Sequence, residues 1–73
     1  MNAAQDLART VRRLRKARRL TQADLAVLAG VGRRFVSDLE RGKPTLRLSE
    51  AQAVLSVFGL ALRVQPLEKE PGS

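Results

Sequence analysis

Only two residues, Gly30 and Val31, lie between two predicted helices near the middle of the chain, and this limits how the chain can fold. The first helix begins after Thr21, where Asp24 three residues later completes a variant of the capping box. It ends at Gly30, because glycine readily takes the left-handed conformation that follows many helices. The second helix runs from about residue 32 to residue 41. Two helices joined by so short a connection must meet at a steep angle.

Two further helices are predicted on either side of this pair. Residues 4–17 carry leucine or valine at positions 7, 11 and 14, which makes one apolar stripe on a helix. Ser49 and Gln52 form a second capping box, so the last helix spans about residues 50–58. The predicted core residues are Leu7, Val11, Leu14, Leu25, Leu28, Ala29, Val36, Leu39, Ala51, Val54, Leu55 and Phe58.

The segment after Gly59 changes to an alternating pattern. Residues 60–65, "LALRVQ", place apolar side chains on one side and Ala61, Arg63 and Gln65 on the other, which predicts a short strand. A lone strand leaves its backbone groups unpaired, so we expect it to pair with the same strand of a second molecule. The last helix carries a second apolar stripe, which indicates a second partner surface. The predicted dimerisation residues are Ala53, Val57, Leu60, Leu62 and Val64.

Composition restricts the function. Fourteen Lys and Arg against seven Asp and Glu give a net charge of +7, and most of the cations are arginine, whose planar fork suits phosphate and guanine edges. This balance favours a polyanionic partner. The chain has no cysteine and no histidine, which excludes disulfides and the usual transition-metal sites. We find no nucleophile–base pair and no paired carboxylates in a plausible cleft, so we expect neither an enzyme nor a cofactor or small-molecule ligand. Because no run approaches the length of a membrane span, we expect a cytoplasmic protein.

Residues 21–42, "TQADLAVLAGVGRRFVSDLERG", resemble the helix-turn-helix of the Cro/C1 (XRE-type) DNA-binding family. The resemblance rests on a capping Thr followed by Gln, a Gly-Val turn and a Glu-x-Gly end. The longer stretch "RRFVSDLERGKPTLRL", with the helix and strand that follow it, is most similar to the HipB-type antitoxin branch. The expected fold is all-α, a lambda-repressor-like bundle of four to five helices with the C-terminal strand pairing across a dimer. Its expected divisions are a DNA-binding domain (1–59), a dimerisation strand (60–65) and a disordered tail (66–73).

In such a motif the second helix of the pair lies in the major groove. With Val36 and Leu39 inward, four residues point away from the core and are the predicted base contacts: Arg33, Arg34, Ser37 and Asp38. Either arginine can fork onto guanine or contact phosphate only, and Asp38 can accept from a cytosine amine or orient Arg34. The predicted phosphate contacts are Thr21, Gln22, Arg15, Arg41, Lys43 and Thr45. The resemblance also implies that Gln22 supports the recognition helix and that Arg15 pairs with Glu40. The roles of Phe35 and Arg47 stay open.

The start of this second helix departs from the usual pattern. Gly32 stands where a Ser or Thr cap is expected, and Arg33 and Arg34 bring two cations to the positive end of the helix dipole. This arrangement costs stability in the free protein, and a phosphate or a base edge would offset the cost.

The predicted function is a homodimeric repressor that reads a pseudo-palindromic site on double-stranded DNA. The HipB-type resemblance implies an antitoxin that represses its own operon and binds a HipA-like kinase toxin. The alternatives are a stand-alone XRE-type regulator and a non-specific basic interaction module.

Overall fold

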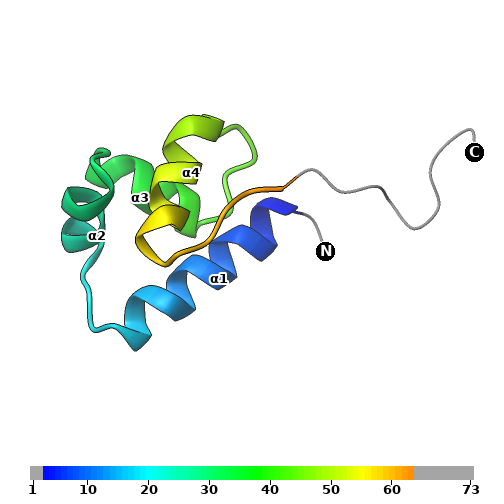
Figure 1. Ribbon diagram of the computed structural model, residues 1–73. Coiled ribbons are helices and arrows are strands. Elements are labelled where there is room, and N and C mark those ends of the chain that lie inside the picture. The colour runs from blue at the N-terminus through cyan, green and yellow to red at the C-terminus, as the bar shows by residue number, and fades with distance from the viewer. Residues whose placement is uncertain (1–2, 64–73) are drawn as a thin grey trace, which may run out of the picture.

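The computed structural model describes residues 3–63, and this part of the chain consists of four helices. They are α1 (Ala3–Ala17), α2 (Gln22–Ala29), α3 (Arg33–Glu40) and α4 (Leu48–Val57) (Figure 1). The predicted all-α class is therefore confirmed. Residues 60–63, which follow α4, do not form a strand, and the predicted pairing with a second molecule stays a prediction. The rest of the predicted strand and the predicted disordered tail lie outside the described residues.

The first helix ends in a strained residue. Asp6 in its first turn and Arg15 and Lys16 in its last turn suit the helix dipole. Arg19 then adopts a φ of +57°, the left-handed conformation, and the N–H of Leu20 closes the helix end on the carbonyl of Arg15 at 3.0 Å. A side chain with a Cβ reaches this conformation only at a cost of about 1–2 kcal/mol. The sequence offers no glycine at this position, so α1 ends without the residue best suited to it.

The predicted ends of α2 are confirmed. Thr21 Oγ accepts from the N–H of Asp24 at 3.0 Å, and the carboxylate of Asp24 accepts from the N–H of Thr21 at 2.9 Å. Gly30 ends the helix with a φ of +71°. The inner face was predicted wrongly at Leu28, whose side chain is 60% exposed, whereas Ala26 is buried. Because α2 packs against both α3 and α4, Leu25 and Ala26 lie on its buried side, whereas Leu28 lies outside that contact.

The fourth helix does not begin as predicted. It starts at Leu48 after Arg47, and no side chain caps its first turn, so the capping box of Ser49 and Gln52 is wrong. The amide of Gln52 instead binds the segment that follows the helix: it donates to the carbonyl of Leu60 at 3.3 Å and accepts from the N–H of Leu62 at 2.8 Å. These two backbone groups have no partner within a helix. They therefore bind the amide of Gln52, which the sequence pattern had assigned to the N-terminal cap of α4.

The core lies between the four helices and is built from aliphatic side chains. The largest fully buried ones are Leu25, Leu39, Val11, Val36 and Val54. Phe58, just after α4, is covered from outside by the guanidinium of Arg18, whose Cζ lies 5.1 Å from the ring centroid. Within residues 3–63 no helix combines the length and the hydropathy that crossing a membrane requires.

Candidate nucleic-acid interface

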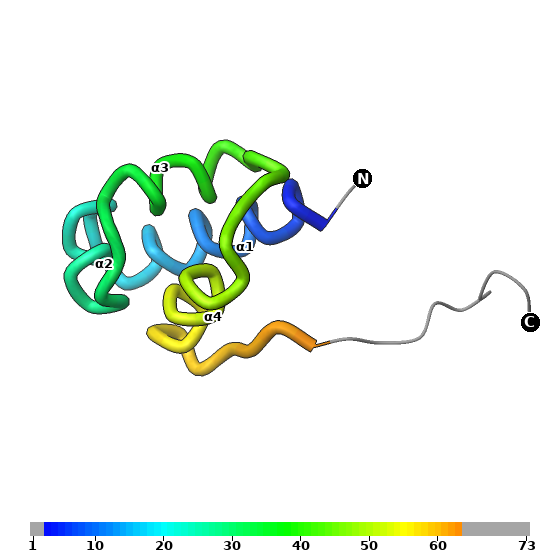
Figure 2. Tube along the Cα trace, turned by 90° about the horizontal axis from the view of Figure 1, so that it is seen from above, coloured from blue at the N-terminus to red at the C-terminus, as the bar shows by residue number. Residues whose placement is uncertain are grey.

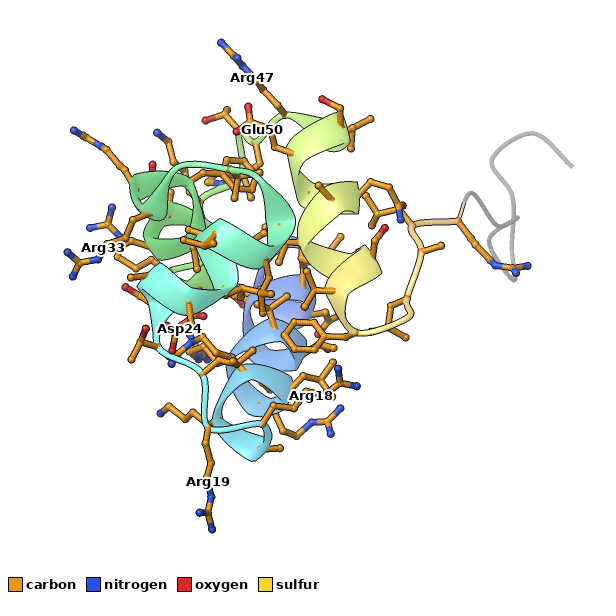
Figure 3. The ribbon with its side chains drawn as sticks, turned by 60° about the vertical axis from the view of Figure 1, so that its left-hand side comes forward. Arg18, Arg19, Asp24, Arg33, Arg47 and Glu50 are labelled. Carbon is orange, nitrogen blue, oxygen red and sulfur yellow. The ribbon has the colours of Figure 1, made fainter. Side chains whose placement is uncertain are left out.

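The first turn of α3 presents two arginines on an open surface. Arg33, labelled in Figure 3, and Arg34 are exposed, and their side chains make no hydrogen bond or ion pair within residues 3–63. They line an open hollow of about 380 Å³ together with Gln22, Ser37 and Arg41. Four of the predicted DNA contacts, from two helices, are thus brought to one concave surface, and Arg41 adds a fifth at its edge.

The start of α3 has no local compensation for these cations. Gly32 is the N-cap residue, no side chain accepts from the free N–H groups, and the first turn contains no acidic residue. The first turn of α3 therefore carries both uncapped N–H groups and guanidinium groups. Such an arrangement binds anions, because both the helix dipole and the side chains favour negative charge there.

Asp38 does not lie on this open surface, and its predicted outward position is wrong. Its side chain is 12% exposed and forms ion pairs with Arg41 and, at 3.6 Å, with Lys43. The hydrogen bond from Arg41 lowers the pKa of Asp38, and the nearby charges of Lys43 and Arg34 lower that pKa further. The turn after α3 folds back over the helix, with the N–H of Lys43 bonded to the carbonyl of Asp38 at 3.1 Å, and this brings the two cations to the carboxylate.

Arg41 and Lys43 thereby become fixed cations at the end of α3. The side chains of both are well exposed, although Asp38 holds them. Thr45 is exposed on the same loop. Phe35 and Leu46 are half-buried and pack against the core, so the loop rests on the protein interior.

Glu40 joins three helices in one polar cluster. It is buried, and its carboxylate accepts from Arg15 Nε at 2.6 Å and from Arg15 Nη2 at 3.0 Å. Gln22 Nε2 donates to the same carboxylate at 3.3 Å. Arg15 Nη1 also donates to the carbonyl of Leu20 at 2.8 Å. The hydrogen bond to Glu40, together with the charge of that carboxylate, raises the pKa of Arg15. The cluster holds α1, α2 and α3 together and orients the amide of Gln22 at the edge of the hollow.

Two predicted phosphate contacts, Arg15 and Thr21, already form hydrogen bonds within the free protein. The Arg15 side chain is only 13% exposed, so little of it remains for a phosphate. Thr21 is exposed, but its hydroxyl caps α2, and the two bonds with Thr21 lower the pKa of Asp24. Arg47, whose role was left open, has a side chain 85% exposed and lies 3.5 Å from Glu50.

The predicted dimerisation residues lie on the opposite part of the molecule. Ala53 and Val57 are half-buried on α4, whereas Leu60 and Leu62 are 41% and 42% exposed. Val64 lies outside the described residues. Leu48, 75% exposed, lines an adjacent apolar hollow of about 500 Å³ together with Leu62.

Three side chains make contacts within the protein that the sequence did not predict: Arg12, Arg18 and Gln52. Arg12 donates to the backbone carbonyl of Glu40, Arg18 to that of Val57, and Gln52 to that of Leu60. Each partner is a backbone carbonyl outside the helix that contains or directly precedes the residue, and such a contact leaves no residue pattern. For Arg18 one signal existed, because the helical wheel places it over the apolar stripe of α1.

Comparison with known proteins adds two findings. Residues 11–65 match the family HTH_3, described as Helix-turn-helix. Over 59 residues the chain is 42% identical to y4mF of Sinorhizobium fredii (strain NBRC 101917 / NGR234), an uncharacterized HTH-type transcriptional regulator. That match covers 81% of this chain and 78% of the relative.

Proposed function

The chain belongs to the HTH_3 helix-turn-helix family, and from that premise we propose that it represses transcription by binding a specific sequence of double-stranded DNA. The regulatory role is supported by the relative, which is named as a transcriptional regulator. The single observation that carries the sequence specificity is the uncapped start of α3. There Arg33 and Arg34 face an open hollow with no acidic residue in the first turn.

In the proposed complex, α3 lies in the major groove with its first turn against the base edges. Arg33 and Arg34 each reach the O6 and N7 atoms of a guanine, and Ser37, one turn further on, contacts a neighbouring base. Asp38 is not part of this set, because it is buried against Arg41 and Lys43. It acts instead by fixing these two cations where the DNA backbone passes.

We further propose that two copies bind together through residues 60–65. Gln52 bonds the backbone of Leu60 and Leu62, which therefore face α4. Successive residues of an extended chain point their backbone groups to opposite sides, so Ala61 and Arg63 offer their N–H and C=O groups outward. The same edge of a second molecule satisfies these groups and covers the exposed Leu60 and Leu62. Two α3 helices then read two half-sites about one helical turn apart.

A finer proposal is that the protein is the antitoxin of a HipBA-like operon. It is supported by the resemblance of residues 33–48 to the HipB-type branch and by the proposed strand pairing after α4. A kinase-like reading frame directly beside the gene is the expected finding. Its absence would leave the stand-alone regulator.

The experiment for DNA recognition starts from duplexes that the protein selects from a random-sequence pool. We expect the selected duplex to bind more tightly than a scrambled one of equal length and composition, and affinity for both to fall steeply with salt. Arg33→Ala or Arg34→Ala should reduce the preference by about 1–3 kcal/mol. Lys43→Ala is the matched control: it removes a cation outside the α3 hollow and should weaken both duplexes alike.

Equal affinity of the wild-type protein for selected and scrambled duplexes at every salt concentration would leave only a non-specific basic module. A mass that stays monomeric at micromolar concentration, alone and on DNA, would refute the pairing of residues 60–65.

A further inference from the structure

A second cationic hollow lies between the first half of α1 and the end of α3. It has a volume of about 310 Å³ and is lined by Gln5, Ala8, Arg9, Arg12, Arg41 and Gly42. Three of these side chains are arginines that come from two separate elements. The hollow is open and mainly polar, so it does not resemble a site for an apolar ligand.

Two of the arginines are held in place by the protein. Arg12 Nη1 donates to the carbonyl of Glu40, and Arg41 Nη2 donates to the carboxylate of Asp38. Gly42, with a φ of +77°, brings the turn close to α1: a Cβ at this position would lie 3.6 Å from Gln5 Cγ. The hollow is therefore built by the close approach of the turn to α1.

The positive charge of this region exceeds what its carboxylates neutralise. Glu40 is already engaged by Arg15 and Gln22, and Asp38 by Arg41 and Lys43. Even without Arg9, two carboxylates thus stand among four cations: Arg12, Arg15, Arg41 and Lys43. An arginine cluster of this kind binds phosphate well, because the planar guanidinium matches its oxygens.

The position of the hollow indicates where the phosphate comes from. Arg41 lines both this hollow and the hollow at the start of α3, so the two cationic surfaces are continuous. Seen from above, α3, the turn after it and the beginning of α1 lie on one side of the molecule, and α4 with residues 60–63 lies on the other (Figure 2). A DNA strand that lies along α3 would therefore pass Arg41 and reach the first half of α1.

We propose that Arg9, Arg12 and Arg41 form a second phosphate site, which holds a backbone phosphate of the DNA outside the bases read by α3. This inference rests on the proposed function, and it adds α1 to the DNA-binding surface. The site adds affinity and no sequence preference, because phosphates are the same at every base pair.

The test compares two lengths of the selected duplex, one with six flanking base pairs on each side and one trimmed to the selected bases. The wild-type protein should bind the flanked duplex more tightly and with a steeper salt dependence. Arg9→Gln and Arg12→Gln should each lower the salt slope on the flanked duplex by about 1 per protomer. Neither should change binding to the trimmed duplex or the preference over scrambled sequence.

Arg19→Gln is the matched control, because it removes the same charge at the far end of α1, where the side chain points away from the protein (Figure 3). Circular dichroism shows whether each variant is folded. If Arg12→Gln unfolds, Arg9→Gln carries the test, provided that its circular dichroism spectrum matches that of the wild type.

Equal wild-type affinity for both lengths, or an Arg9→Gln variant that behaves like Arg19→Gln, would overturn the inference. If inorganic phosphate binds at Arg9 and Arg12 but the flanking base pairs do not change the affinity for DNA, the site holds a free anion. That result would also overturn the inference. None of these results affects the preference for the selected sequence, so the proposed function is tested separately.

Discussion

Removing the carboxylate of Glu40 should destabilise the protein more than any other single loss of charge in residues 3–63. The side chain is 4% exposed and receives three hydrogen bonds from Arg15 and Gln22, so it joins α1, α2 and α3. Breaking a buried ion pair by removing one partner costs about 3–5 kcal/mol, because the other charge stays buried without compensation. A chain of this length has a total unfolding free energy of about 4–11 kcal/mol. Glu40→Ala should therefore remove a large part of the stability, and the melting temperature should fall by about 12–40 °C.

The assay is urea unfolding followed by circular dichroism, at two protein concentrations so that any dimer contribution is separated from folding. A double-mutant cycle isolates the pair. Arg15→Met and Glu40→Leu each leave one charge alone, whereas the double variant leaves none. We expect the double variant to be more stable than Glu40→Leu, with a coupling energy of about 1–3 kcal/mol.

Two results would refute this reasoning. One is a loss below about 1 kcal/mol for Glu40→Ala, within the range of a surface ion pair. The other is a double variant whose loss equals the sum of the two single losses, which would show that Arg15 and Glu40 do not act together.

Three further predictions concern local features. Asp24 and Asp38 have lowered pKa values, so their ionised carboxylates stabilise the fold above the usual aspartate pKa, and this stability is lost as the pH falls through the lowered values. Asp24→Asn should therefore flatten the acid side of a curve of unfolding free energy against pH. An unchanged curve would contradict this. Arg19→Gly should stabilise the protein by about 1 kcal/mol in thermal unfolding, because glycine adopts the positive φ without a Cβ clash, and a lower melting temperature would disprove the strain. Gly32→Ser should stabilise the free protein by a few tenths of a kcal/mol, since a Cβ there meets no atom within 4 Å and the hydroxyl can cap α3. If the Ser variant also binds the selected duplex as tightly as the wild type in a direct titration, DNA binding does not require the absence of a side chain at position 32.

Local signals predicted the ends of α2 well. Thr21 and Asp24 cap the helix through bonds between neighbours, and Gly30 supplies the positive φ that its type favours. Such features depend on a few adjacent residues, so the sequence contains all the information they need. The inward positions of Val36 and Leu39 follow in the same way from the helical period.

The wrong predictions concern positions whose environment is set by a part of the chain distant in the sequence. Leu28 is exposed because α3 and α4 together select another side of α2. Ser49 does not begin α4, and Gln52 binds the backbone of residues 60–62 in place of a cap. Asp38 is buried because the turn after α3 brings Arg41 and Lys43 back to it. In each case the competing partner becomes a neighbour only when the chain is folded.

The isolation of Arg33 and Arg34 from the rest of the protein has a consequence for how new binding specificities arise. Both side chains are exposed and make no hydrogen bond or ion pair in the described part of the chain, so replacing them leaves the folded scaffold intact. If these residues read the bases as proposed, single substitutions at either position should change the DNA sequence that the protein prefers without unfolding it. Gln22 has no such freedom, because its amide also binds Glu40. A library for altered specificity should therefore randomise positions 33 and 34 and keep position 22 fixed.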